Sequence, residues 1–265
     1  MKSIKPFINS LFSIFNLRSL ILSVAALACT YISKRNGWTA EYPMVLLGTA
    51  VIFPIVFSLN GAYIRREEAL RYYAEIKAGL RSIFIAATTW HGGLNQKDTA
   101  HFADLTSNVL FEVRAYITSE NNENTEREEK VYLQIHELSK HLEKQCRKEN
   151  YLGGEVGACF SFLNLTIANF EKLKHIYQYR TPRSLQAFSD VFITVLPLLY
   201  GPVFAGLSDK INNDILIYII PVLFAFILSS LDNIQAHLED PFDGVGVDDI
   251  VINAEKFRTS LTENA

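Results

Sequence analysis

The sequence predicts an all-α protein with four membrane-spanning helices and a water-soluble helical region between the second and third of them. Four long stretches without charges carry this prediction, together with the confinement of most charges to the rest of the chain. A bilayer core takes about 20 apolar residues, and about 17 suffice for an upright helix. The four stretches are Ser19–Ser33, Tyr42–Ile64, Val191–Ser208 and Ile215–Leu231.

The first stretch is the shortest and needs two flanking residues to reach the required length. Leu17 extends it, and Arg18 is expected to snorkel, with its guanidinium at the membrane surface. Residues 6–16 are expected to form an interfacial amphipathic segment. They are not read as part of a signal peptide, because Arg18 interrupts the apolar run and no small-x-small cleavage site precedes Tyr31.

The composition fits a chain that is half in lipid and half in water. Hydrophobic residues make up 49% of the 265 residues and charged residues 20%. The charges lie mainly between Arg65 and Arg183 and after Asp232. A net charge of -3 gives no support to a nucleic-acid partner, so the lipid bilayer is the expected environment. Three cysteines at unrelated spacings are expected to stay reduced and inert.

Positive charges beside the first two spans predict the orientation. They favour a cytoplasmic location for both termini and the middle region. Lys2, Lys5 and Arg18 precede the first span and Arg65, Arg66 and Arg71 follow the second, against Lys34 and Arg35 between them. The expected division is 1–64 (interfacial segment and two spans), 65–186 (cytosolic helices), 187–231 (two spans) and 232–265 (cytosolic tail), all within one structural unit.

The middle region has the charge spacing of helices. The second span is expected to continue into water to about Trp90 as one helix, because no turn signal interrupts it. Three further helices are predicted at Asp98–Ile117, Glu126–Glu149 and Gly157–Tyr177, with a cap at Asp98 and a helix break at Gly153-Gly154.

Enzyme signatures are missing from the sequence. The six histidines include no i,i+4 pair for a helical zinc site, and the glycines around Gly154 lack the Lys-Ser/Thr of a phosphate loop. We therefore expect no catalytic residue and no cofactor.

One stripe of the second span has two interpretations. Thr49, Phe53 and Phe57 recur at i, i+4 and i+8, which places a hydroxyl and two aromatic rings on one helix face. Such a stripe can face lipid or pack within the protein, and periodicity alone favours that interpretation. It can also form a hydrophobic constriction that gates a pore by dewetting.

Several motifs resemble those of the bestrophin family of anion channels, in the same order across Tyr42–Ile250. Phe57, Asn60, Tyr63, Arg65 and Glu68-Ala69 resemble the family's segment after the pore neck. Further matches are Phe170-Glu171-Lys172-Leu173, Thr181-Pro182, Leu196-Pro197, Leu231-Asp232, Leu238-Glu239 and Pro241-Phe242. Ser58, Leu70 and Arg183-Ser184 depart from the family pattern, which indicates a divergent member.

The resemblance implies a homopentamer around one axial pore, with Thr49, Phe53 and Phe57 at the neck and Arg183 at the cytosolic aperture. It implies a channel for chloride or other small monovalent anions. Two alternatives stay open at this stage. A channel of the same fold could pass cations, and a non-conducting membrane scaffold would show the same hydropathy.

A calcium site is not expected. In many animal members of the family an unbroken acidic run follows the Pro-Phe-Gly motif, whereas here Asp243 is separated from Asp248 and Asp249 by apolar and glycine residues. These three carboxylates are weak candidates, because calcium takes six to eight oxygen ligands.

Overall fold

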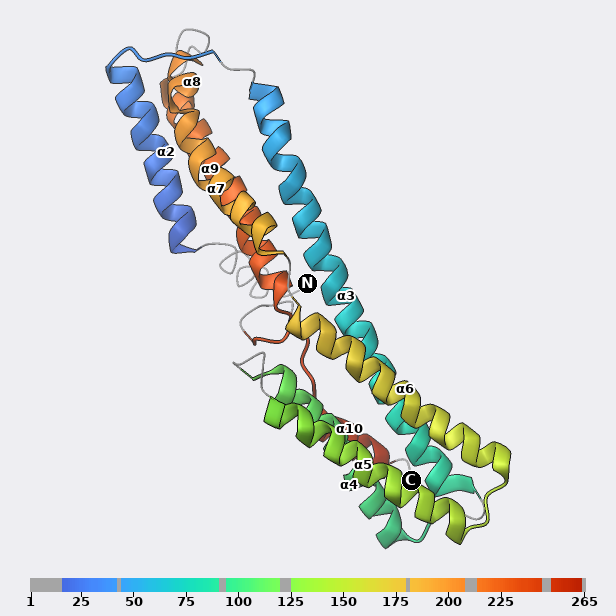
Figure 1. Cartoon of the computed structure of the whole chain (residues 1–265). Helices are drawn as coiled ribbons and strands as arrows, with labels where there is room; N and C mark the ends of the chain where they lie inside the picture. Colours follow the sequence, from blue (N-terminus) through green and yellow to red (C-terminus); the bar gives the residue numbers. More distant parts are fainter. Residues whose placement is uncertain are drawn as a thin grey trace. The chain divides into compact units, whose positions relative to one another are not determined.

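The computed structural model describes residues 16–41, 44–90, 94–119, 125–179, 182–207, 214–244 and 249–263. Within these ranges the secondary structure is helical, with no strand. The helices are α2 (Leu17–Arg35), α3 (Met44–Thr89), α4 (Gln96–Ile117), α5 (Thr125–Lys148), α6 (Gly153–Gln178), α7 (Arg183–Leu199), α8 (Gly201–Gly206), α9 (Asp214–Glu239) and α10 (Ala254–Thr262) (Figure 1).

Four helical segments are long and apolar enough to cross a membrane, and they coincide with the four predicted spans. They are Leu17–Arg35, Gly48–Thr89, Ser184–Gly206 and Ile215–Glu239. The predicted continuation of the second span is confirmed, since α3 ends at Thr89. With 46 residues, α3 is roughly 70 Å long, about twice the thickness of a bilayer core.

The chain forms two compact units. The first, which we call the membrane unit, comprises residues 1–66, 181–241 and 245–249; the second, the helical unit, comprises 67–180, 242–244 and 250–265. The chain passes from one to the other within α3, between Arg66 and Glu67.

In the membrane unit, α2 packs along α9 and α8, and α7 packs against α9 and α2 (Figure 1). The buried core includes Leu22 of α2, Ile55 of α3, Leu196 of α7 and Leu228 of α9. Gly201 permits the close approach of α8 to α2, because a Cβ there would lie 2.6 Å from the Cys29 sulfur. A small residue at this crossing is typical of helices packed in lipid, where backbones approach closely.

In the helical unit, α4 packs against α5 and α10, and α6 packs against α5 and α4. Ile83 of α3, Leu110 of α4, Leu138 of α5 and Phe170 of α6 are buried in one core. The α3–α6 crossing is tight at Gly79, where a Cβ would lie 3.1 Å from the Phe162 carbonyl oxygen and still closer to the Thr166 hydroxyl.

Two predicted helix boundaries were wrong. Asn95, not Asp98, caps α4: its side-chain oxygen accepts a hydrogen bond of 2.8 Å from the Asp98 backbone N–H. The break before α6 lies ahead of the two glycines, at residues 149–152, where Asn150 has a φ of 52°. The carboxylate of Glu155 accepts a hydrogen bond of 2.7 Å from the Leu152 N–H, which lets the helix begin at Gly153 despite its glycines.

The C-terminal tail folds onto the helical unit. Asn253 caps α10 by accepting a hydrogen bond of 2.7 Å from the Lys256 N–H. Phe257 and Leu261 of this helix are buried in the core. Arg258 pairs with Asp104 of α4 at 2.6 Å, so apolar packing and ion pairing both hold the tail helix.

Candidate functional site

The first half of α3 has two faces with opposite environments. Val51 and Ile55 face the core of the membrane unit and are 3% and 1% exposed. Phe53 and Phe57 are each 60% exposed, and Thr49 is exposed on the same side. The predicted stripe of Thr49, Phe53 and Phe57 therefore lies together on one face, directed away from the core of its own chain.

The two rings of the stripe contact each other. Their centroids are 4.7 Å apart and the ring planes make an angle of 79°, an edge-to-face arrangement. Such pairing restricts both rings and makes a continuous apolar surface one helical turn long.

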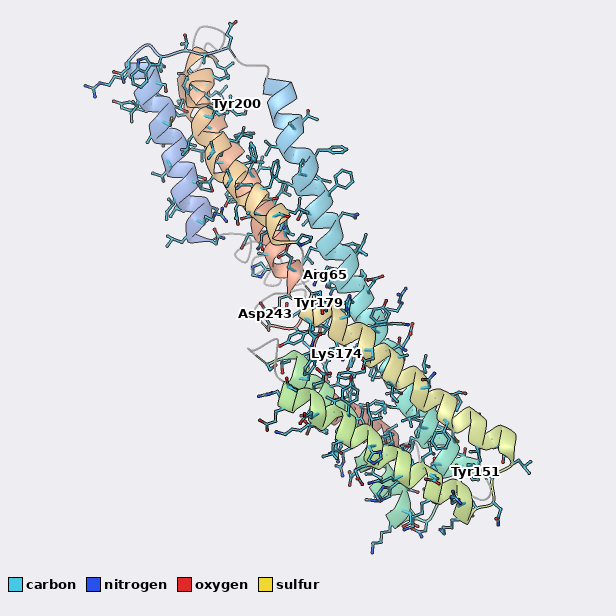
Figure 2. All side chains as sticks on the ribbon, in the orientation of Figure 1. Arg65, Tyr151, Lys174, Tyr179, Tyr200 and Asp243 are labelled. Carbon is cyan, nitrogen blue, oxygen red and sulfur yellow. The ribbon has the colours of Figure 1, made fainter. Side chains whose placement is uncertain are left out.

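Directly after Phe57, α3 carries no charge at the position where the family that the sequence resembles has an arginine. Ser58 stands there, 2% exposed, and its hydroxyl has no hydrogen-bond partner among the described residues. The exposed residues that follow on α3 before Arg65 are Asn60, Gly61, Tyr63 and Ile64. Positive charge enters this helix first at Arg65 (Figure 2).

Arg18 joins three helices of the membrane unit, and the expected position of its guanidinium at the membrane surface stays a prediction. Its guanidinium pairs with Asp190 of α7 at 2.9 Å and with Asp232 of α9 at 2.7 Å. It also donates to the Thr194 hydroxyl at 3.2 Å. Three separate helices thus share one charged group, and pairing offsets the cost of placing Arg18 next to lipid.

The remaining predicted site residues are described only in part. Arg183 is the first residue of α7, after Pro182 at the cap position, and its side chain lies outside the described residues, as does Asp248. Asp243 is exposed in a turn whose Gly244 has a φ of 74°, and Asp249 is half-buried. Over the described residues, no group of three or more His, Cys, Asp or Glu side chains is arranged to hold a metal ion.

A polar cluster ties α5 to α6 in the helical unit (Figure 2). Lys174 pairs with Glu128 at 2.9 Å and with Glu171 at 2.8 Å, and donates to the Tyr132 hydroxyl at 3.0 Å. Tyr132 also donates to Glu171. Burial alone would raise the pKa of Glu171, but the bonds from Lys174 and Tyr132 lower it below the ordinary value.

The opposite balance holds for Lys174. Burial alone would lower its pKa, but the bonds to Glu171, Tyr132 and Glu128 together raise it above the ordinary value. Glu171 belongs to the Phe-Glu-Lys-Leu motif of the sequence, so this motif has a structural role as the bridge between two helices.

Comparison with known proteins gives a result for structure only. No protein-family profile matches the sequence, and no curated protein matches it either. A crystal structure of a bacterial bestrophin homologue from Klebsiella pneumoniae superposes with a TM-score of 0.74 at 13% identity and covers 96% of both chains. A single-substitution variant of that homologue gives a TM-score of 0.74 at 13% identity and covers 97% of both chains. Another variant gives 0.71 at 14% identity and covers 96% of both chains.

The chain has the bestrophin fold. The likeness covers nearly the whole chain at low identity, as expected for a divergent bestrophin-like sequence. With its four candidate spans, this bestrophin-like protein is an integral, multi-pass membrane protein.

Sequence reasoning missed two of the clusters described above. Asp190 was not singled out, although Arg18, Asp190 and Asp232 each lie at the edge of an apolar stretch. Three charges at comparable depth in three spans are a usable signal for a pairing within the membrane unit. The cluster around Lys174 carried no such signal, because charged residues are common on every helix of the helical unit.

Proposed function

We propose that this bestrophin-like protein is a homopentameric ion channel that passes monovalent anions, with chloride as the expected ion. The observation that carries the proposal is the exposed aromatic stripe of α3. Thr49, Phe53 and Phe57 face away from the core of their own chain, on a helix whose other face is buried. A surface of this kind needs either lipid or further copies of the chain to cover it.

Five copies around an axis would turn the stripe into a narrow neck. Each copy would contribute Phe53 and Phe57 as rings of aromatic side chains, and Thr49 would add a ring of hydroxyls. An apolar constriction excludes water until its walls move apart, which provides a gate without any charged group. In this proposal the exposed residues of α2 and α9, such as Val24 and Ile219, contact lipid.

The proposed topology places both termini in the cytoplasm. Residues 65–186 would then form the cytosolic vestibule of the channel and residues 232–265 a cytosolic tail, with spans in 1–64 and 187–231. Arg183 would lie at the cytosolic aperture, where its guanidinium keeps a positive charge at every accessible pH. A neutral neck does not choose the sign of the ion, so anion preference is assigned to this ring of arginines.

Two measurements on the purified protein test the proposal. Native mass spectrometry in mild detergent should give five copies of the 30.0 kDa chain. In a planar bilayer with a potassium chloride gradient, the reversal potential should approach the chloride equilibrium potential. A reversal potential near that of potassium would identify a cation channel, and a silent, well-folded pentamer would identify a scaffold.

A further inference from the structure

A cavity in the helical unit is lined by basic residues and, among the residues that the structure describes, by no acidic one. It lies between α3 and α10 and has a volume of about 780 Å³. Its polar and aromatic lining includes Tyr73, Lys77, Arg81, Asn253, Lys256 and Phe257. The three cationic side chains come from two helices that are far apart in the sequence.

The positive charges in this cavity have no carboxylate partners among the described residues. The Lys77 ammonium lies over the Tyr73 ring at 4.5 Å from its centroid. The Arg81 guanidinium lies over the Phe257 ring at 5.6 Å and donates to the Ser260 hydroxyl at 2.7 Å. Both contacts orient the cations without neutralising them, because rings and hydroxyls carry no net charge.

One acidic residue of α10 and one of its neighbour α4 pair with residues outside the cavity lining. Glu255 forms an ion pair of 2.8 Å with Arg114, and Asp104 forms one of 2.6 Å with Arg258. Neither carboxylate lines the cavity. The local excess of positive charge is therefore a property of this cavity and contrasts with the slightly acidic chain as a whole.

Placing these cations together is unfavourable unless an anion joins them. Lys77 and Arg81 are four residues apart on α3 and so share one face, where like charges repel. The N-terminus of α10, which begins at Ala254 with Lys256 in its first turn, adds the positive end of a helix dipole. A multivalent anion in the cavity would offset both the repulsion between the cations and the positive end of the helix dipole.

We propose that this cavity binds a phosphate-bearing anion with more than one negative charge. Arg81 can donate two parallel N–H bonds to one phosphate group, and the two lysines supply point charges that tolerate varied geometry. The volume of about 780 Å³ is much larger than chloride requires and accommodates a phosphate-bearing molecule. A soluble diphosphate and the phosphorylated headgroup of a lipid present the same chemistry to these side chains.

Titration calorimetry on the purified full-length protein tests this site with inorganic pyrophosphate as the probe. Lys77→Gln together with Lys256→Gln removes two charges and leaves Arg81 in its contacts with Phe257 and Ser260. We expect the dissociation constant for pyrophosphate to rise about tenfold or more, since hydrogen bonds to charged groups contribute at least that factor. Lys97→Gln is the matched control, because Lys97 is exposed on α4 and does not line the cavity.

A second arm separates the two sources of the ligand. Calorimetry with a short-chain, water-soluble phosphoinositide is carried out with and without excess pyrophosphate, because the four spans would attach the protein to vesicles whatever this cavity binds. Competition by pyrophosphate that is lost in the double variant assigns a site open to both sources. Phosphoinositide binding that needs Lys77 and Lys256 but resists pyrophosphate assigns the lipid headgroup. The proposal is overturned if wild type binds neither probe, or if the double variant, with an unchanged melting temperature, binds both as wild type does.

Discussion

Arg18 and Asp232 lie 2.7 Å apart and join the first span to the last, although 213 residues separate them in the chain. The Asp232 side chain is 18% exposed, so its carboxylate depends on Arg18 for compensation. The pairing explains why an arginine interrupts an otherwise apolar first span, and it predicts the consequence of removing either partner.

Arg18→Leu should lower the free energy of unfolding in detergent by about 2 kcal/mol, because Asp190 and Asp232 then share a site without a cation. The double variant Arg18→Leu/Asp232→Leu should recover part of this loss, since the buried charge goes with its partner. Arg35→Leu, at the other end of α2, is the control. Thermal melts of the purified variants check this order of stabilities, and a double variant less stable than Arg18→Leu would contradict it.

The aromatic stripe predicts a gain of conductance on truncation. Phe53→Ala together with Phe57→Ala should widen the proposed dewetted neck and raise single-channel conductance or open probability in planar bilayers. Ile219→Ala together with Leu223→Ala on α9 truncates two exposed apolar residues at the same spacing. If the two double variants change the currents equally, or if neither changes them, the stripe of α3 does not form the neck and is assigned to lipid contact.

The aperture proposal predicts a salt-dependent selectivity. Arg183→Ala should reduce the preference for anions over cations at low ionic strength, and Arg183→Glu should reduce it further or reverse it. The effect should fade in high salt, because the Debye length falls to about 3 Å at 1 M. Reversal potentials at two ionic strengths check this. If Arg183→Glu has the reversal potential of wild type in low salt, Arg183 does not face the conduction path.

The α3–α6 crossing predicts a position-specific response to alanine. Gly79→Ala should destabilise the protein, because an added Cβ meets the Thr166 side chain and the Phe162 carbonyl. Overpacking costs about 1–3 kcal/mol, against about 1 kcal/mol gained in helix propensity. Gly61→Ala on the same helix meets nothing within 4 Å, so it should be neutral or stabilising. The melting temperatures of the two variants are compared with that of wild type. Equal changes in melting temperature would argue against a tight α3–α6 crossing.

The cluster around Lys174 predicts a stability difference that depends on pH. The lowered pKa of Glu171 means that its contribution is present above the ordinary value of 4.5 and is lost as pH falls through the folded-state pKa. Lys174→Met should therefore lower the melting temperature most near pH 7. The gap to wild type should narrow as pH drops below about 4.5, as a series of melts would reveal. A difference in melting temperature that stays constant with pH would mean that Lys174→Met destabilises the protein through lost packing alone.

Much of the fold follows from the order of residues alone. Runs of apolar residues long enough to span a bilayer determine four helices, because backbone groups in lipid must be satisfied within the segment. The extension of α3 to Thr89 follows from continuous helical charge spacing without a turn residue. The i, i+4, i+8 spacing of Thr49, Phe53 and Phe57 determines that they share a face, since helix geometry is local.

Only the tertiary structure decided which groups meet across the chain. That Arg18 pairs with Asp190 and Asp232, and that Lys77 and Arg81 share a cavity with Lys256, depends on how separate helices pack. Helix boundaries likewise depended on side-chain contacts, as with Glu155 at the start of α6. Only the tertiary structure shows that the aromatic stripe faces away from the core, because periodicity defines which residues share a helix face but not what surrounds that face. Side-chain periodicity is a local property of the chain, whereas long-range pairing is set by the packing free energy of the whole fold.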